Sequence, residues 1–302
     1  MAQVLIGLKK EDYAHRFDSD AMDVVTAIPL LPKIINSFMN YAQVKWDIVD
    51  YCGSSFHVTH SSCEELYDLL EQASTTLDLQ AVPPMYIQQN YNINAFTMGH
   101  QHDAYMMFNS GTMNKLSNQE LLFVIGHEMG HIKSGHVLYQ SVATYLTAMI
   151  SAIPIVGALV ARIGELTLRT AIGKWRRMAE FTADRAGLLA CQNIDVAVSA
   201  LMKMSGLPER FYDKVSLEGF KAQSNEFKTR HAGNIYDTLL KMNSTHPWTV
   251  LRVSELIDWH ESGEYEKILN EHRGKRCTFC QEVVSLETNR CPTCGRDEWK
   301  TL

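Results

Sequence analysis

The stretch "LSNQELLFVIGHEMGHIKSGH", residues 116–136, decides how this chain is interpreted. Ser117 stands three residues before Glu120, a capping box that starts helices, and apolar residues follow at helical spacing. On a helix, His127 and His131 are one turn apart and project from the same face, so both imidazoles can reach one metal ion. The stretch therefore predicts a helix that carries two metal ligands.

Glu128 completes the pattern H-E-x-x-H. In this pattern zinc lowers the pKa of a bound water, and the glutamate takes the proton of that water without binding the metal. Gly130 inside the motif is a poor helix former, which indicates that another element packs closely against it. The alternative is a solvated helix that carries two histidines by chance, and we favour the zinc site.

A third ligand is needed, and two stretches offer one. His136 lies five residues after His131, whereas the metzincin pattern needs six, and on a continuing helix it would point about 140° away. We therefore expect His136 near the site but not as a ligand. In "WRRMAEFTADRAG", residues 175–187, Glu180 can complete a His/His/Glu set. Asp184, one turn on, can accept a hydrogen bond from the free N–H of a ligating histidine.

Four stretches in order resemble the HtpX-like family of zinc metallopeptidases, which includes the CAAX prenyl proteases. They are "NAFTMG", "SGTMNKLSNQELLFVIGHEMGHIKSGH", "WRRMAEFTADRAG" and "STHPWTVLRVSEL", and the similarity covers most of residues 80–260. The resemblance implies zinc on His127, His131 and Glu180, with Glu128 as general base. It also implies an edge strand whose backbone binds the substrate as an added β-strand, at Asn94, Ala95 and Phe96.

"STHPWTVLRVSEL", residues 244–256, adds two candidates. Pro247 suits the first turn of a helix, which puts His246 at the N-terminal boundary and Arg252 nearly two turns on. The resemblance implies that His246 stabilises the oxyanion of the tetrahedral intermediate and that Arg252 lies behind the metal ligands. A helix-capping His246, with Arg252 in a structural ion pair, remains open, and so does the part played by His100 and His102.

The C-terminal segment "CTFCQEVVSLETNRCPTCG", residues 277–295, predicts a four-cysteine zinc ribbon. Its two C-x-x-C pairs are ten residues apart, and Gly295 suits the tight turn of a zinc knuckle. So small a segment has little core, so the metal would supply its folding energy. Two disulfides are the alternative, but an odd number of cysteines and no N-terminal signal favour a reducing, cytoplasmic location. The predicted ligands are Cys277, Cys280, Cys291 and Cys294.

Residues 137–161 contain no charged side chain and are long enough to cross a bilayer. A single crossing is excluded because His131 and Glu180, on either side of it, must meet one ion. Two crossings need roughly 40 apolar residues, and the return half is rich in charge. We expect a helical hairpin that turns near residues 154–157 and is packed in the protein, folded over the active site or in peripheral contact with a membrane.

The whole chain is predicted to be an α+β protein: a mostly helical zincin-type metallopeptidase domain with a small β-sheet, followed by the ribbon. We place the metallopeptidase domain at 1–268, with a helical part at 1–80 and a catalytic core at 81–262, then a linker at 269–276 and the ribbon at 277–302. The net charge of −6 argues against nucleic-acid binding.

The predicted function is zinc-dependent endoproteolysis of protein or peptide substrates, with one catalytic and one structural Zn²⁺. A protein partner is expected on the ribbon. The alternative is a latent or inactive peptidase fold that acts as an adaptor or chaperone through its groove and its ribbon.

Overall fold

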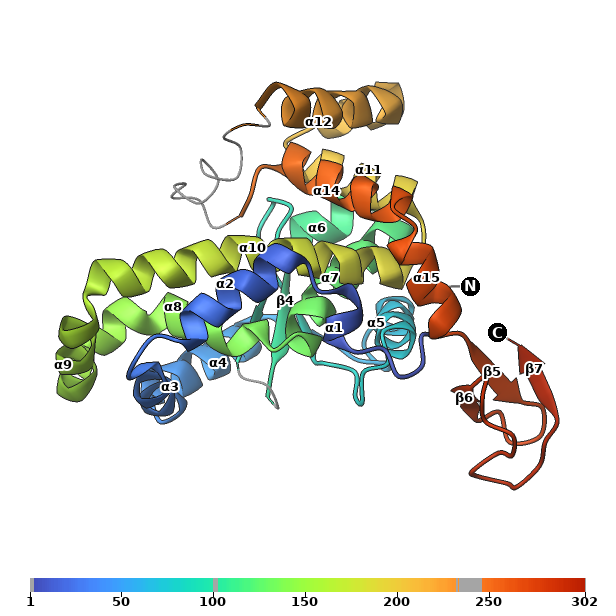
Figure 1. Cartoon of the computed structure of the whole chain (residues 1–302), viewed down its shortest axis with the longest axis horizontal. Helices are drawn as coiled ribbons and strands as arrows, with labels where there is room; N and C mark the ends of the chain where they lie inside the picture. The colour runs from blue at the N-terminus through green and yellow to red at the C-terminus, as the bar shows by residue number, and fades with distance from the viewer. Residues whose placement is uncertain (1–2, 100–102, 232, 234–245, 302) are drawn as a thin grey trace.

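Two long helices, α7 (Asn118–Lys133) and α10 (Glu165–Cys191), cross at the middle of the molecule (Figure 1). The structure, a computed structural model, describes residues 3–99, 103–231, 233 and 246–301. Helices dominate and the sheets are small, which confirms the predicted α+β class.

Helix α7 begins as its sequence predicts. The Ser117 side chain accepts a hydrogen bond from the Glu120 backbone, and the Glu120 carboxylate accepts one from Ser117 N at 2.8 Å. All side chains from Leu121 to His131 are buried. Because buried polar groups need partners, the motif residues of α7 must be satisfied inside the protein.

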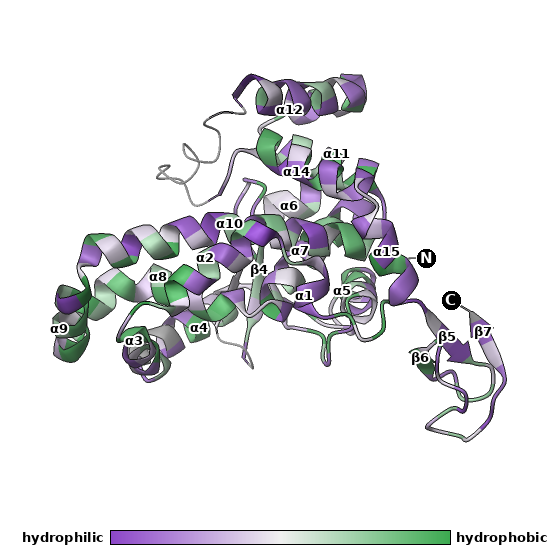
Figure 2. Ribbon diagram, viewed as in Figure 1, coloured by the Kyte–Doolittle hydropathy of each residue, from purple (hydrophilic) through white to green (hydrophobic). Residues whose placement is uncertain are grey.

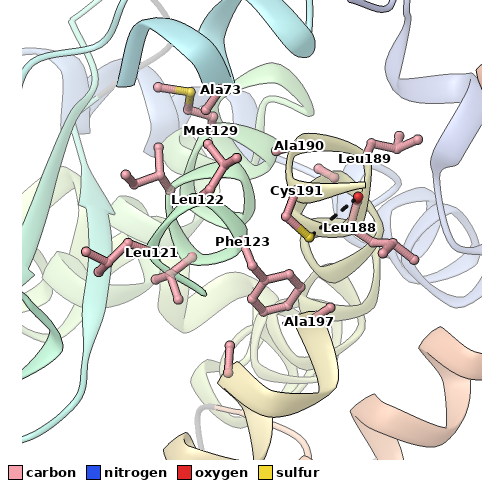
Figure 3. Close-up of a cluster of buried hydrophobic side chains, with 14 of the residues drawn as sticks. Ala73, Leu121, Leu122, Phe123, Met129, Leu188, Leu189, Ala190, Cys191 and Ala197 are labelled. Carbon is pink, nitrogen blue, oxygen red and sulfur yellow. Dashed lines mark hydrogen bonds between the residues drawn. The ribbon is translucent and has the colours of Figure 1, made fainter. Parts of the chain in front are cut away.

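Small residues let α7 and α10 approach closely. A Cβ atom on Gly126 would lie 2.3 Å from Cβ of Ala190, and one on Gly130 would lie 2.5 Å from Cβ of Ala186. The close contact expected at Gly130 is therefore confirmed. Figure 3 shows the apolar side chains around this crossing, which come from α5 (Glu64–Thr76), α7, α10 and α11 (Ile194–Met204).

A four-stranded sheet has the order β1-β2-β4-β3. Its strands are β1 (Phe56–Val58), β2 (Met85–Gln88), β4 (Tyr105–Asn109) and β3 (Ala95–Met98). Strands β2 and β4 are parallel, and the other two pairs are antiparallel. The expected edge strand is present: β3 pairs with β4 on one side, and no strand in the described parts of the chain pairs with its other side.

The apolar segment after α7 forms two helices, α8 (His136–Ala152) and α9 (Pro154–Ile163). A helical hairpin is present as expected, but α9 makes its reversal, bent by 114° from α8, instead of a tight turn. Pro154 lacks an N–H and so starts a new helix, and Gly164, at φ 91°, ends it. Figure 2 shows hydrophobic residues along both helices.

The hairpin packs against helices from the N-terminal part. These are α2 (Arg16–Thr26) and α3 (Leu31–Met39), which share a second apolar core with α8, α9 and the first half of α10, while α4 (Ala42–Ser54) lies next to β2. Among the described residues no single helix is long and apolar enough to span a membrane, although the bent pairs α2/α3 and α8/α9 satisfy the length and composition of a span.

The remaining helices are α1 (Lys10–Tyr13), α6 (Ser110–Lys115), a 3-10 helix (Glu209–Lys214), α12 (Leu217–His231), α14 (Thr249–Glu261) and α15 (Glu264–Glu271). Helix α14 packs on α10, α11 and α12. Because α14 begins at Thr249, Pro247 precedes the helix and Arg252 lies in its first turn, one turn earlier than expected.

The C-terminal segment forms a three-stranded antiparallel sheet of order β6-β5-β7 at the opposite end of the molecule from α9 (Figure 1). Its strands are β5 (Gly274–Cys277), β6 (Val283–Ser285) and β7 (Trp299–Thr301). The segment 269–276, expected to be a linker, contains the end of α15 and most of β5. The N-terminal segment holds it: Ile6 N donates to His272 O at 2.9 Å. The proposed domain limits stay a prediction.

Candidate active site and metal centre

His127, His131 and Glu180 come together where α7 crosses α10. Each Nε2 lies 3.6 Å from an oxygen of the Glu180 carboxylate. One potential ligand atom from each residue lies within 4.8 Å of the other two, and all three side chains are buried. Tetrahedral zinc with bonds of about 2.1 Å has ligand–ligand distances of roughly 3.4 Å, close to those observed.

The Glu180 carboxylate has the state expected of a metal ligand. Burial would raise the pKa of this group, but the neighbouring His246, His127 and His131 hold the pKa well below its usual range. Its Oε2 atom is buried and makes no hydrogen bond with the described residues. A buried, ionised oxygen without a donor is costly, so these residues fit a bound cation, and a His/His/Glu set is typical of zinc.

The outer nitrogen of His127 has a strong partner. Its Nδ1 lies 3.0 Å from Oδ1 of Asp184, and Arg252 donates to both oxygens of that carboxylate at 2.8 and 2.6 Å. Burial would lower the pKa of His127, but Asp184 and Glu180 outweigh it and raise the pKa to about 9. Because an ionised carboxylate only accepts, Asp184 keeps a proton on Nδ1 of His127, and a bound metal would take the place of the proton on Nε2.

His131 has a different environment. Burial lowers its pKa to about 4, which favours the neutral imidazole that binds metals. Its Nδ1 lies 3.0 Å from Nδ1 of His136. The spacing argument assumed that α7 continues to His136. Instead, Gly135 at φ 72° turns the chain, and a new helix, α8, starts at His136. His136 therefore contacts the outer nitrogen of His131 and not the ligand atoms.

Glu128 is buried on the cleft side of α7, and burial raises the pKa of its carboxyl group. Its Oε2 accepts a hydrogen bond of 2.5 Å from Oγ1 of Thr97 on β3. The glutamate next to the ligands is thus tied to the edge strand. Thr97 was not identified from the sequence, although it follows Phe96 directly; alternation along the strand was the available signal, because Thr97 is the buried residue of β3.

Two cavities, of about 450 and 200 Å³, meet at this centre. The larger one extends along β3 toward α8 and α4, with Tyr145 and Tyr51 in its wall. The smaller one extends toward Phe123 and Met204. The residues that line both cavities are Asn94, Ala95, His127, Glu128, Glu180 and His246.

His246 lies at the opening of the site. Its side chain is 48% exposed, and its Nε2 is 3.8 Å from Oε2 of Glu180. His246 therefore lies next to the three candidate metal ligands but is not one of them. His100 and His102 lie outside the described residues.

The four cysteines of the C-terminal sheet also converge. Sγ of Cys277 lies 3.6 Å from that of Cys294, and Sγ of Cys280 lies 3.3 Å from that of Cys291, and all four are free thiols. Two turns bring them together, with Gln281 and Gly295 in the left-handed region at φ 64° and 74°. The turn expected at Gly295 is confirmed, and the cluster fits a tetrahedral metal site.

The fold and the site define a class of protein: a metallopeptidase with the ligand set of the gluzincins. A model of the peptidase family M48 matches residues 61–260, and the chain belongs to this family. It is thus a metalloprotease that acts on protein or peptide substrates, and the predicted enzyme class and the family resemblance are confirmed.

Curated relatives agree with this assignment. Over 91% of the chain and 79% of the relative, it is 28% identical to the plastoglobule-localized metallopeptidase 48, chloroplastic, of Arabidopsis thaliana. It is 25% identical to a protease HtpX homolog of Ralstonia pickettii (strain 12J), over 69% of the chain and 78% of the relative. No solved structure matches the chain.

Proposed function

We propose that this protein is a zinc-dependent endopeptidase in which His127, His131 and Glu180 bind the catalytic Zn²⁺ and Glu128 is the general base. The observation that carries the proposal is the buried carboxylate of Glu180, whose Oε2 makes no hydrogen bond with the described residues and whose two oxygens each lie 3.6 Å from a histidine nitrogen, with Glu128 lining the same cavities. When bound there, zinc supplies Lewis-acid polarisation of the scissile carbonyl and lowers the pKa of a coordinated water.

The protein groups then divide the remaining work. Glu128 receives the proton of the attacking water and passes it to the leaving amine, and its raised pKa makes it a better proton acceptor than an ordinary glutamate. Thr97 holds its carboxylate in place. His246, at the junction of the cavities, donates a hydrogen bond to the oxyanion. Asp184 and Arg252 keep His127 oriented.

The substrate binds in extended form along the open edge of β3. The backbones of Asn94, Ala95 and Phe96 pair with it, and side chains on either side of the scissile bond enter the two cavities. Because the cavities continue in both directions from the metal centre, the chain can extend past it at both ends, which favours internal cleavage.

The ribbon binds a second, structural Zn²⁺ through its four cysteines and presents a surface for a protein partner. The hairpin of α8 and α9 makes peripheral contact with a membrane in a protein that is otherwise cytoplasmic. This part of the proposal is supported by two apolar residues at the tip formed by α9 and the start of α10, Ile155 and Leu166, which are 62% and 80% exposed.

Metal content and proteolysis, measured together, test the proposal. Wild type should contain two zinc ions per chain under reducing conditions, and Glu180→Ala should contain only the ribbon zinc. Glu128→Gln should keep both ions and lose cleavage of unfolded casein. One zinc in both wild type and Glu180→Ala would refute the catalytic site, and loss of zinc in Glu128→Gln would make Glu128 a ligand. Full zinc content without proteolysis in wild type would favour an adaptor.

A further inference from the structure

We propose that His136 and Asp18 are positioning residues of the catalytic centre, because together they fix the tautomer and the ring orientation of His131. The inference rests on the proposed metal site. It assigns a role to a histidine that follows the H-E-x-x-H motif and to an aspartate more than a hundred residues away.

The contacts form one continuous chain. Nδ1 of His131 lies 3.0 Å from Nδ1 of His136, and Nε2 of His136 lies 3.0 Å from Oδ2 of Asp18. All three residues are at most 5% exposed. Water is therefore kept from these groups, and each polar atom depends on its protein neighbour.

When a metal is bound to His131, the hydrogen bonds can run in only one direction, from His131 through His136 to Asp18. Binding through Nε2 requires a proton on Nδ1 of a neutral His131, so this nitrogen donates. Nδ1 of His136 must then accept, which places the proton of neutral His136 on Nε2, and Asp18 accepts it. Every link has one donor and one acceptor, so the chain favours the tautomer of His131 that binds metal.

Asp18 is held in place by other elements. Its Oδ1 accepts from Nε1 of Trp175 at 2.9 Å, and its Oδ2 accepts from Oγ1 of Thr182 at 2.8 Å as well as facing His136. Trp175 and Thr182 belong to α10, the helix that also carries Glu180. The chain therefore connects α2, the start of α8 and α10 to one metal ligand.

A second polar group lies near Nδ1 of His131. The amide nitrogen of Gln140 lies 3.3 Å from its Nδ1, farther than His136. An amide N–H cannot accept the proton that His131 carries when it binds metal, so His136 is the better acceptor. The two metal-binding histidines thus differ: His127 donates to a carboxylate paired with Arg252, and His131 donates to a neutral imidazole.

Zinc affinity at the catalytic site tests this role without recourse to activity. Zinc-loaded full-length chains are titrated with a chelator, and ribbon zinc is then released with a thiol reagent, so that the two ions are counted separately. His136→Leu removes the acceptor and should weaken catalytic zinc by about 10- to 100-fold. His136→Asn can place an amide oxygen near the position of Nδ1 and should lose less. His272→Leu is the control, because this histidine contacts Ile6 and Asp12 and shares no partner with His136 or Asp18, and it should stay within about twofold of wild type.

Asp18→Asn tests the direction of the chain. An amide N–H replaces one carboxylate oxygen, so it must face either an N–H of Trp175 or Nε2 of His136. In the first case the side chain at position 18 loses the bond to Trp175 that held Asp18 in place, and in the second case the His136 proton moves to Nδ1 and opposes the proton on His131. Zinc affinity should therefore fall although Asp18 touches neither the ion nor a ligand, and this variant serves equally if His136→Leu does not fold.

Each outcome has a defined meaning. Wild-type affinity in both His136→Leu and Asp18→Asn would overturn the positioning role, and an equal loss in His272→Leu would overturn it too, because general loosening would then explain the effect. A wild type that holds only the ribbon zinc would overturn the proposed metal site itself. A smaller loss of zinc affinity in His136→Asn than in His136→Leu, with His272→Leu unaffected, supports the chain of contacts.

Discussion

Glu128, the proposed base, accepts a hydrogen bond from Thr97 on β3, the strand proposed to bind the substrate. This one hydrogen bond therefore fixes the base relative to the substrate. Thr97→Val keeps the shape of the side chain but removes the donor 2.5 Å from Oε2 of Glu128. A hydrogen bond to a charged group is worth about 1.5–3 kcal/mol, so kcat/KM should fall about 10- to 100-fold. Casein cleavage and zinc content are measured together, and zinc should not change.

Thr97→Ser is the matched control, because it restores the hydroxyl and should recover most of the activity. Equal activity in the valine and serine variants would show that the hydroxyl does not position Glu128.

Arg252 compensates a buried charge behind His127. Arg252→Met leaves the carboxylate of Asp184, 1% exposed, without its cation, so the free energy of unfolding should fall by about 3–5 kcal/mol. The double variant Arg252→Met/Asp184→Leu removes both charges and should regain much of this stability while binding catalytic zinc weakly, since His127 has lost its acceptor. Urea denaturation of the metal-free chains and a chelator titration give the two values. A double variant with wild-type zinc affinity would contradict the role of Asp184.

At the scale of elements, the crossing of α7 and α10 sets the position of Glu180. Gly130→Ala places a methyl group 2.5 Å from Cβ of Ala186, so the helices must separate. Overpacking of this kind costs about 1–3 kcal/mol of stability, and Glu180 should move away from the two histidines and weaken zinc binding. Thermal unfolding and metal content measure both effects.

Ala186→Gly in the same chain removes the clashing methyl and should restore zinc binding to Gly130→Ala, and stability should return close to wild type because the helix propensity gained in α7 offsets that lost in α10. Failure of this second change to recover zinc would mean that the helix spacing does not control the ligand geometry.

The hairpin tip is the element proposed to touch a membrane. Ile155→Ser/Leu166→Ser should reduce cosedimentation with anionic phospholipid vesicles, since it removes apolar area that is already exposed. Surface changes of this kind alter the free energy of unfolding by about 0.5 kcal/mol or less. Phe279→Ser, in the ribbon at the opposite end of the molecule, is the control (Figure 1). Equal sedimentation of all three proteins would exclude contact through the tip.

Local sequence patterns predicted those parts of the fold and the site that depend on residues close together in the chain. The capping box at Ser117, the one-turn spacing of His127 and His131 and the cysteine pairs all depend on neighbouring residues. Glu180 became a candidate only because the H-E-x-x-H motif upstream needs a third ligand, since E-x-x-x-D alone is common on solvated helix faces. Asp18 gave no signal of its role, and alternation along the strand could indicate only that Thr97 is buried, because their partners lie 118 and 31 residues away and meet them only through tertiary packing.

At the scale of the whole molecule, the ribbon and the hairpin lie at opposite ends with the metal centre between them (Figure 1). Residues of α8 line the larger cavity, but none of the described ribbon residues lines either cavity. The ribbon joins the rest of the chain through α15 and the N-terminal segment, where Gln3 donates to the carbonyl of Leu269 at 2.6 Å. The geometry therefore separates ribbon folding from access to the active site.

Cys291→Ser/Cys294→Ser tests this separation in the full chain. Loss of two ligands should remove the structural zinc, and residues beyond 277 should become sensitive to trypsin because the ribbon has little core of its own. Proteolysis of casein should stay within about twofold of wild type, since the ribbon and the cleft share no described residue. A large rise in activity would show that the ribbon keeps the enzyme latent. Loss of catalytic zinc would show that the folded ribbon is needed to hold Glu180 on α10 in place.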